Sequence, residues 1–81
     1  MQTQNKMNEV QKVLEEISRE YGDAVITHIT DYEYGKLRVR IFLSHQYQYS
    51  YTTLQKWQDK LGAWLSSVSV VKNTLLITYR I

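Results

Sequence analysis

The sequence contains no cysteine, which excludes disulfide bonds, thiolate metal ligands and cysteine nucleophiles. Its three glycines are too dispersed to form the glycine-rich loops that bind phosphate in nucleotide-binding proteins. No apolar run approaches the roughly 18–20 residues of a transmembrane helix, and the first residues lack the apolar segment of a secretory signal. We therefore expect no membrane insertion of this segment, and a cytoplasmic location if the chain is complete.

Imidazoles are also scarce, since His28 and His45 are the only two. Neither has the spacing of a helix-borne metal site, and each is better interpreted as an ordinary strand or loop residue than as a catalytic group. The adjacent carboxylates Glu15 and Glu16 point in different directions on a helix, so they cannot converge as an acid–base pair. We expect a protein that is not an enzyme, with no cofactor, no metal and no small-molecule substrate.

The 81 residues suffice for one domain, 1–81, with one hydrophobic core, because 43% of them are hydrophobic. Charge is unevenly distributed along the chain. Residues 1–33 carry seven acids and three bases, whereas residues 34–81 carry seven bases and one acid. This asymmetry suggests an anion-binding surface or head-to-tail contact between copies, unless folding interleaves the two halves and cancels much of the field.

The clearest structural signal is the stretch 35–44, where Leu37, Val39, Ile41 and Leu43 alternate with polar residues and Phe42. A period of two is typical of a half-buried β-strand. The β-branched stretch 24–30 predicts a strand before it, joined through a five-residue link, 31–35, into an antiparallel hairpin. Gly35 is expected to supply a positive φ in that link.

Two amphipathic helices and a second hairpin are expected around this strand. Apolar residues at steps of three and four predict helices over 5–21 and 52–65, the first ending at Gly22 and the second capped by Thr52. Gly62 is expected inside the second helix, where it allows close approach to the sheet. Strands over 67–71 and 74–81 follow, joined by a two-residue turn at Lys72 and Asn73.

The element order is therefore αββαββ, which predicts a two-layer α+β sandwich with both helices on one face of a four-stranded sheet. This order is a circular permutation of the ferredoxin-like fold. The other sheet face is left open, and its expected lining includes three arginines and apolar residues: Arg38, Arg40, Arg80, Phe42 and Leu76.

This open face allows two functional interpretations besides a structural one. Cations beside an aromatic ring can grip single-stranded nucleic acid, because charge follows phosphate and the ring stacks on bases. Alternatively, the apolar residues can form a contact with another protein. The structural interpretation, that the arginine stems only shield the sheet while their heads stay in water, is the simplest.

A tyrosine-rich connection, 45–50, precedes the second helix. Tyr47, Tyr49 and Tyr51 alternate with Gln and Ser, so in an extended segment all three rings point the same way. They either cover the start of the second helix or form a recognition strip of the kind common at protein interfaces.

The pattern resembles the periplasmic domain of inner-membrane platform proteins of type II secretion and type IV pilus machines. The resemblance rests on a G-x-L-x-V hairpin pattern at Gly35, Leu37 and Val39, and on the spacing of Leu54 and Trp57 in the second helix. It implies a non-catalytic assembly domain that dimerises with itself or with related subunits, in the periplasm if the chain is a fragment of such a protein. The chain is also similar to the cytoplasmic domain of cation-diffusion transporters, where His28 falls near a histidine position.

We therefore expect a protein–protein interaction domain that self-associates through a sheet edge or the open sheet face, with a second copy or a related subunit as partner. The alternatives are a small single-stranded nucleic-acid-binding module that uses the basic face, and a small inhibitor of a larger enzyme complex. The candidate binding residues are Arg38, Arg40, Phe42, Leu76, Arg80, Tyr47 and Tyr49.

Overall fold

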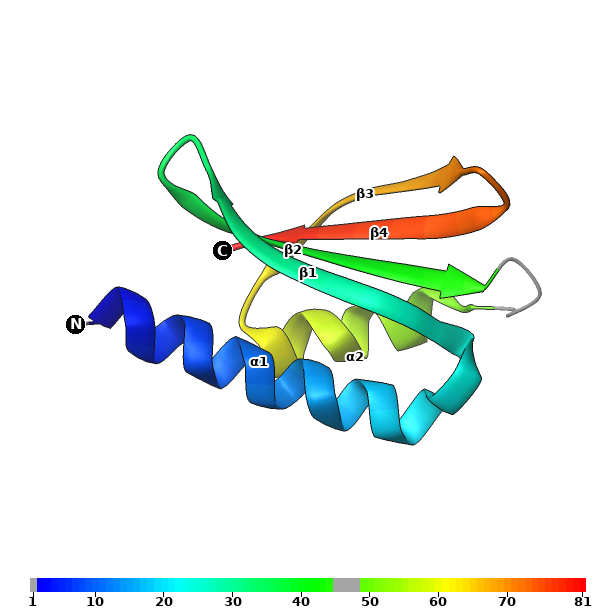
Figure 1. Ribbon diagram of the computed structural model, residues 1–81, viewed down its shortest axis with the longest axis horizontal. Coiled ribbons are helices and arrows are strands. Elements are labelled where there is room, and N and C mark those ends of the chain that lie inside the picture. The colour runs from blue at the N-terminus through cyan, green and yellow to red at the C-terminus, as the bar shows by residue number, and fades with distance from the viewer. Residues whose placement is uncertain (1, 45–48) are drawn as a thin grey trace.

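The computed structural model of the chain describes residues 2–44 and 49–81. Its elements, in chain order, are α1 (Gln2–Tyr21), a short 3₁₀ turn (Gly22–Ala24), β1 (Val25–Glu33), β2 (Lys36–Ser44), α2 (Tyr51–Leu61), β3 (Trp64–Val71) and β4 (Thr74–Arg80). The four strands form one antiparallel sheet in the order β1-β2-β4-β3. Both helices lie on the same side of this sheet (Figure 1). The predicted two-layer α+β sandwich of αββαββ order is confirmed.

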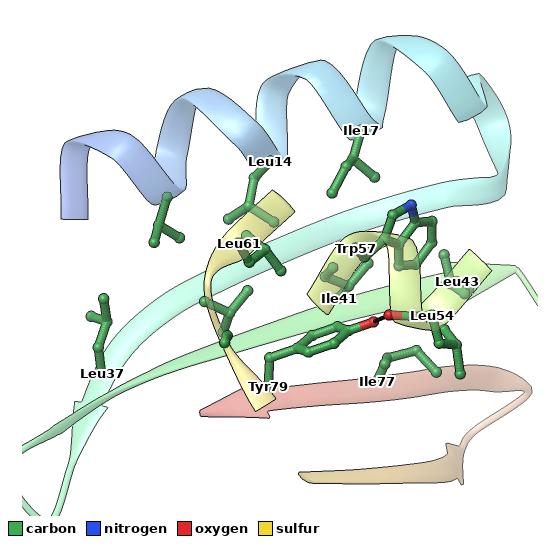
Figure 2. Close-up of a cluster of buried hydrophobic side chains, with 13 residues drawn as sticks. Leu14, Ile17, Leu37, Ile41, Leu43, Leu54, Trp57, Leu61, Ile77 and Tyr79 are labelled. Atoms are coloured by element: carbon green, nitrogen blue, oxygen red, sulfur yellow. Dashed lines mark hydrogen bonds between the residues drawn. The ribbon is translucent and has the colours of Figure 1, made fainter. Parts of the chain in front are cut away.

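The core lies between the helices and the inner face of the sheet (Figure 2). The alternation predicted for β2 is confirmed, because its four aliphatic residues are all buried. The helices contribute one stripe each, and β4 contributes two residues from the centre of the sheet. The buried apolar residues are Val10, Leu14, Ile17, Leu37, Val39, Ile41, Leu43, Leu54, Trp57, Leu61, Ala63, Ile77 and Tyr79.

The first hairpin is tighter than the sequence suggested. The predicted five-residue link is wrong, because β1 continues to Glu33 and only Tyr34 and Gly35 form the turn. Both turn residues have positive φ, 55° and 75°, which matches the right-handed twist of the flanking strands. The positive φ expected at Gly35 is confirmed. Consequently Asp31 and Glu33 are strand residues whose side chains point to the outer face, rather than loop residues.

The second helix is shorter than predicted. It begins after Ser50, whose hydroxyl oxygen accepts a 3.2 Å hydrogen bond from the backbone N–H of Thr53, so the cap is Ser50 and not Thr52. It ends at Leu61 because Gly62 adopts a left-handed conformation, φ 64°, and its N–H bonds back to Asp59. Gly62 is therefore the helix stop rather than an interior residue.

The early stop moves Trp64 from the predicted helix into β3, which starts three residues before the expected strand. The predicted turn at Lys72 and Asn73 is confirmed, with φ of 46° and 67°. The first helix begins at Gln2 rather than residue 5. Within the described residues, neither helix is long and apolar enough to cross a membrane.

Candidate functional site

The outer face of the sheet carries the residues that the sequence assigned to it. Cross-strand register places Arg38 opposite Arg80 and Phe42 opposite Leu76 on neighbouring strands β2 and β4. Arg40 lies between them in β2. These five candidate residues therefore share one surface, on the side of the sheet that the helices leave open (Figure 1).

The sequence did not reveal that two carboxylates share this surface. Asp31 lies opposite Arg38 in the β1–β2 register. Its carboxylate accepts two hydrogen bonds from Arg38, of 2.9 Å from Nε and 2.8 Å from Nη2, and a third of 3.0 Å from Nη2 of Arg40. Glu33 accepts hydrogen bonds from both Arg38 and Arg80. The period-two alternation, had it been extended past residue 30, would have placed both acids beside the arginines.

These contacts form an ion-pair network across three strands. The hydrogen bond from Arg38, with the charges of Arg38 and Arg40, holds the pKa of Asp31 below its ordinary value of 3.8. The hydrogen bond to Asp31 and the neighbouring carboxylates raise the pKa of Arg38. All three arginine heads are thus already engaged, which leaves them less available for phosphate than their number in the sequence suggested.

The second candidate surface is β3, which forms one edge of the sheet. It has eight residues and contains no charge, proline or glycine. Natural edge strands are normally protected by charges, prolines, bulges or a covering element, because their free N–H and C=O groups can pair with another chain. Its one irregularity, between Leu65 and Ser67, lies near its start and leaves residues 67–71 in regular register.

The inner face of β3 is apolar, and its second half is only partly covered. Val68 and Val70 pair with Ile77 and Leu75 of β4, so they point to the helix side of the sheet. They nevertheless remain 38% and 72% exposed. The core covers Leu65 at the start of this face, but the part of the edge that carries Val68 and Val70 is left largely without a cover.

The opposite edge, β1, is better protected than β3. Its outer face carries the two acids of the ion-pair network, although its register, like that of β3, is interrupted only near its start, between Val25 and Thr27. The helix α1 packs against it on the inner side. The two edges of the sheet therefore differ in charge and in cover, because β3 carries no charged residue and its valines remain exposed on the helix side.

A shallow hollow lies where α2 passes into β3. It is lined by Gln58, Asp59, Gly62, Ala63 and Trp64. The Gln58 side chain shapes this corner, because its Oε1 accepts a 2.8 Å hydrogen bond from the backbone N–H of Leu65. Trp64, at the first position of β3 and opposite Arg80, lies on the outer side of the sheet and is 74% exposed. The start of the edge strand therefore also carries an exposed apolar side chain, on the face opposite to Val68 and Val70.

The remaining candidate residues belong to the segment around the start of α2 and to β1. Tyr49 is exposed just before α2, and Tyr51 is the first residue of that helix. Tyr47 and His45 lie outside the described residues. His28 is half-buried on β1, on the helix side, opposite Ile41. Within residues 2–44 and 49–81, no group of three His, Cys, Asp or Glu side chains is arranged to hold a metal ion.

Comparison with protein families, with curated protein sequences and with solved structures gives no match for this chain.

Proposed function

We propose that the chain is a non-catalytic assembly domain that self-associates through the β3 edge. The observation that carries this proposal is the combination, on one strand, of free edge backbone, no charge and uncovered valines. The role agrees with what the resemblance to secretion and pilus platform domains implies.

Backbone geometry supports pairing at this edge. In a hairpin with a two-residue turn, the residues that flank the turn form a hydrogen-bonded pair, and hydrogen-bonded and non-hydrogen-bonded pairs then alternate. Val71 and Thr74 flank the turn. Val68 and Val70 therefore direct their N–H and C=O groups away from β4, towards the free edge, and a strand added there would satisfy them.

Side-chain burial supports it as well. Removing Val68 and Val70 from water would contribute about 25 cal/mol for each Å² of apolar surface buried. No charged side chain of β3 would have to be desolvated. A second copy fits this chemistry because two identical, uncharged strands are complementary across a two-fold axis.

The basic outer face is the weaker candidate. Its three arginines are engaged by Asp31 and Glu33, so a nucleic acid would have to replace those carboxylates. This face carries four cations, the three arginines and Lys36, and the two acids. Its excess of positive charge is therefore small. Salt-dependent binding of a single-stranded oligonucleotide at low ionic strength, by a protein that stays monomeric, would favour the nucleic-acid interpretation instead.

The test is the mass of the protein in solution, measured by light scattering after size exclusion at increasing concentration. The wild-type chain is expected to approach twice its 9.7 kDa mass. Val70→Pro removes an N–H that points to the free edge and leaves the β3–β4 hydrogen bonds in place, and proline is tolerated at such edge positions. This variant is expected to fold and to remain monomeric.

Tyr32→Pro is the matched control, because Tyr32 occupies the equivalent position on the β1 edge, next to the hydrogen-bonded pair that closes the first turn. We expect this variant to associate like the wild type. Circular dichroism establishes that each variant is folded. A wild type that stays monomeric at high micromolar concentration, or equal association of folded Val70→Pro protein, would overturn the proposal.

A further inference from the structure

We infer that the two copies pair antiparallel about a two-fold axis that passes beside Ser69, so that Ser69 of one copy lies opposite Ser69 of the other. This inference rests on the proposed association through the β3 edge and specifies its register. It follows from the pattern of free backbone groups, the position of the bulge and the position of the turn.

The backbone pattern excludes half of the antiparallel registers. Only residues that direct their N–H and C=O groups to the free edge can form hydrogen-bonded pairs with a new strand, and in the regular part of β3 these are Val68 and Val70. A register that places Val68 opposite Ser69 of the second copy would pair a free residue with one already bonded to β4. Such odd registers make no continuous ladder.

The length of the regular segment selects one of the remaining antiparallel registers. Residues 67–71 are bounded by the irregularity between Leu65 and Ser67 on one side and by the Lys72–Asn73 turn on the other. Centring the axis beside Ser69 overlaps all five residues of both copies. Val68 of each copy then pairs with Val70 of the other copy. In each of these two pairs, both residues donate their N–H and accept with their C=O, so each pair forms two backbone hydrogen bonds.

The neighbouring registers are poorer. Centring the axis on Val70 would place Val68 opposite the turn residue Lys72, whose φ of 46° is incompatible with a strand. Centring it on Val68 would place Val70 opposite Ser66, inside the irregular segment. Both shifts lose half of the backbone hydrogen bonds available to the centred pair.

The centred register also brings similar side chains together on the helix side of the sheet. Because Val68 and Val70 share the helix side of the sheet, the four valines of two copies would form one apolar cluster on that side. On the outer face, Ser69 would lie opposite Ser69 of the second copy, and Ser67 would lie opposite Val71 of the second copy. The pairs at these three positions are non-hydrogen-bonded pairs of the new ladder, whose Cα atoms lie about 4.5 Å apart.

That spacing allows the register to be read by disulfide formation, since bridged cysteines have Cα atoms about 4.4–6.8 Å apart. The chain has no cysteine of its own, so single-cysteine variants have no competing thiol. Ser69→Cys is expected to form a covalent dimer with itself under a glutathione redox buffer, seen on a non-reducing gel. Ser67→Cys, on the same strand and face, is the matched control and is expected not to do so.

A mixture of Ser67→Cys and Val71→Cys proteins is expected to cross-link although neither variant does alone. Preferential self-linking of the Ser67→Cys or Val71→Cys variant would overturn the register, and equal self-linking of all three would indicate parallel strands. Absence of every cross-link in a protein that is dimeric and sensitive to Val70→Pro would overturn the register but not the proposed association. A monomeric protein would overturn both.

Discussion

The hydroxyl of Tyr79 donates a 2.8 Å hydrogen bond to the backbone carbonyl oxygen of Leu54, and so connects β4 with α2 through the core (Figure 2). Tyr79 is fully buried at the centre of the sheet. We predict that Tyr79→Phe lowers the free energy of unfolding by about 1 kcal/mol, the usual net contribution of one hydrogen bond. Urea denaturation measures the loss. Tyr34→Phe is the control, because Tyr34 is almost fully exposed in the first turn, and it is expected to change stability little.

The burial of Tyr79 also predicts how the free energy of unfolding changes at alkaline pH. Burial raises the pKa of Tyr79 well above its ordinary value of 10.0. As the pH rises past that value, the unfolded chain releases this proton while the folded chain retains it, so the contribution of Tyr79 is present below pH 10 and is lost above it. Denaturation between pH 9 and 11 should therefore show a steeper loss in the wild type than in Tyr79→Phe. Parallel curves would contradict this assignment.

At acid pH the corresponding group is Asp31. Its pKa is lowered by the hydrogen bond from Arg38, so its stabilising contribution is present above pH 3.8 and is lost as the pH falls through the lower folded value. We predict that Asp31→Asn flattens the acid limb of the stability curve below about pH 4. Asp23→Asn, which removes an exposed carboxylate from the 3₁₀ turn, should leave that limb unchanged. The measurement is the urea midpoint at pH 2.5 to 7 in low salt.

Several features of the fold could be predicted from the sequence because they depend on local periodicity. The alternation of Leu37 to Leu43 defines a strand with one buried face wherever it lies in the sheet. The Lys72–Asn73 turn follows from a residue type that tolerates positive φ, flanked by alternating strands. For such features, local sequence and tertiary structure agree.

Features that depend on contacts between distant residues could not be predicted in the same way. The apolar spacing of Trp57, Leu61 and Trp64 continues a helical stripe, and only the left-handed Gly62 ends the helix before Trp64. The acids of the ion-pair network belong to β1, but their partners belong to β2 and β4. The exposure of Val70 depends on which strands the helices cover, and the alternation of β3 carries no information on that.

Gly62 gives a direct test of why the second helix ends where it does. Its φ of 64° is costly for a residue with a Cβ, so Gly62→Ala should destabilise the protein by about 1 kcal/mol. For a domain of this size that loss corresponds to roughly 4–8 °C in the melting temperature. The added methyl group itself would meet only the flexible end of Lys6, so backbone strain is the expected cause. Gly62→Asn should recover part of the loss, because asparagine tolerates this conformation. Equal losses in the two variants would indicate a steric cause.

The two tryptophans provide a final, matched comparison within one chain. Trp57 is buried in the core, where its ring packs edge to face against that of Tyr21, with 5.2 Å between the ring centroids. Trp64, in contrast, is largely exposed at the start of the edge strand. Trp57→Ala should lower the free energy of unfolding by about 3–5 kcal/mol, and Trp64→Ala by less than about 0.5 kcal/mol in dilute, monomeric protein.

Fluorescence separates the environments of the same two residues. The emission of Trp64→Phe protein comes from Trp57 alone, so it should be blue-shifted and independent of protein concentration. The wild type should shift towards the blue as concentration rises, because an antiparallel partner on β3 brings its hairpin turn to the end of the strand where Trp64 lies. Val70→Pro should abolish the concentration dependence. If the wild-type spectrum stays constant while the mass doubles, the contact between copies does not reach Trp64.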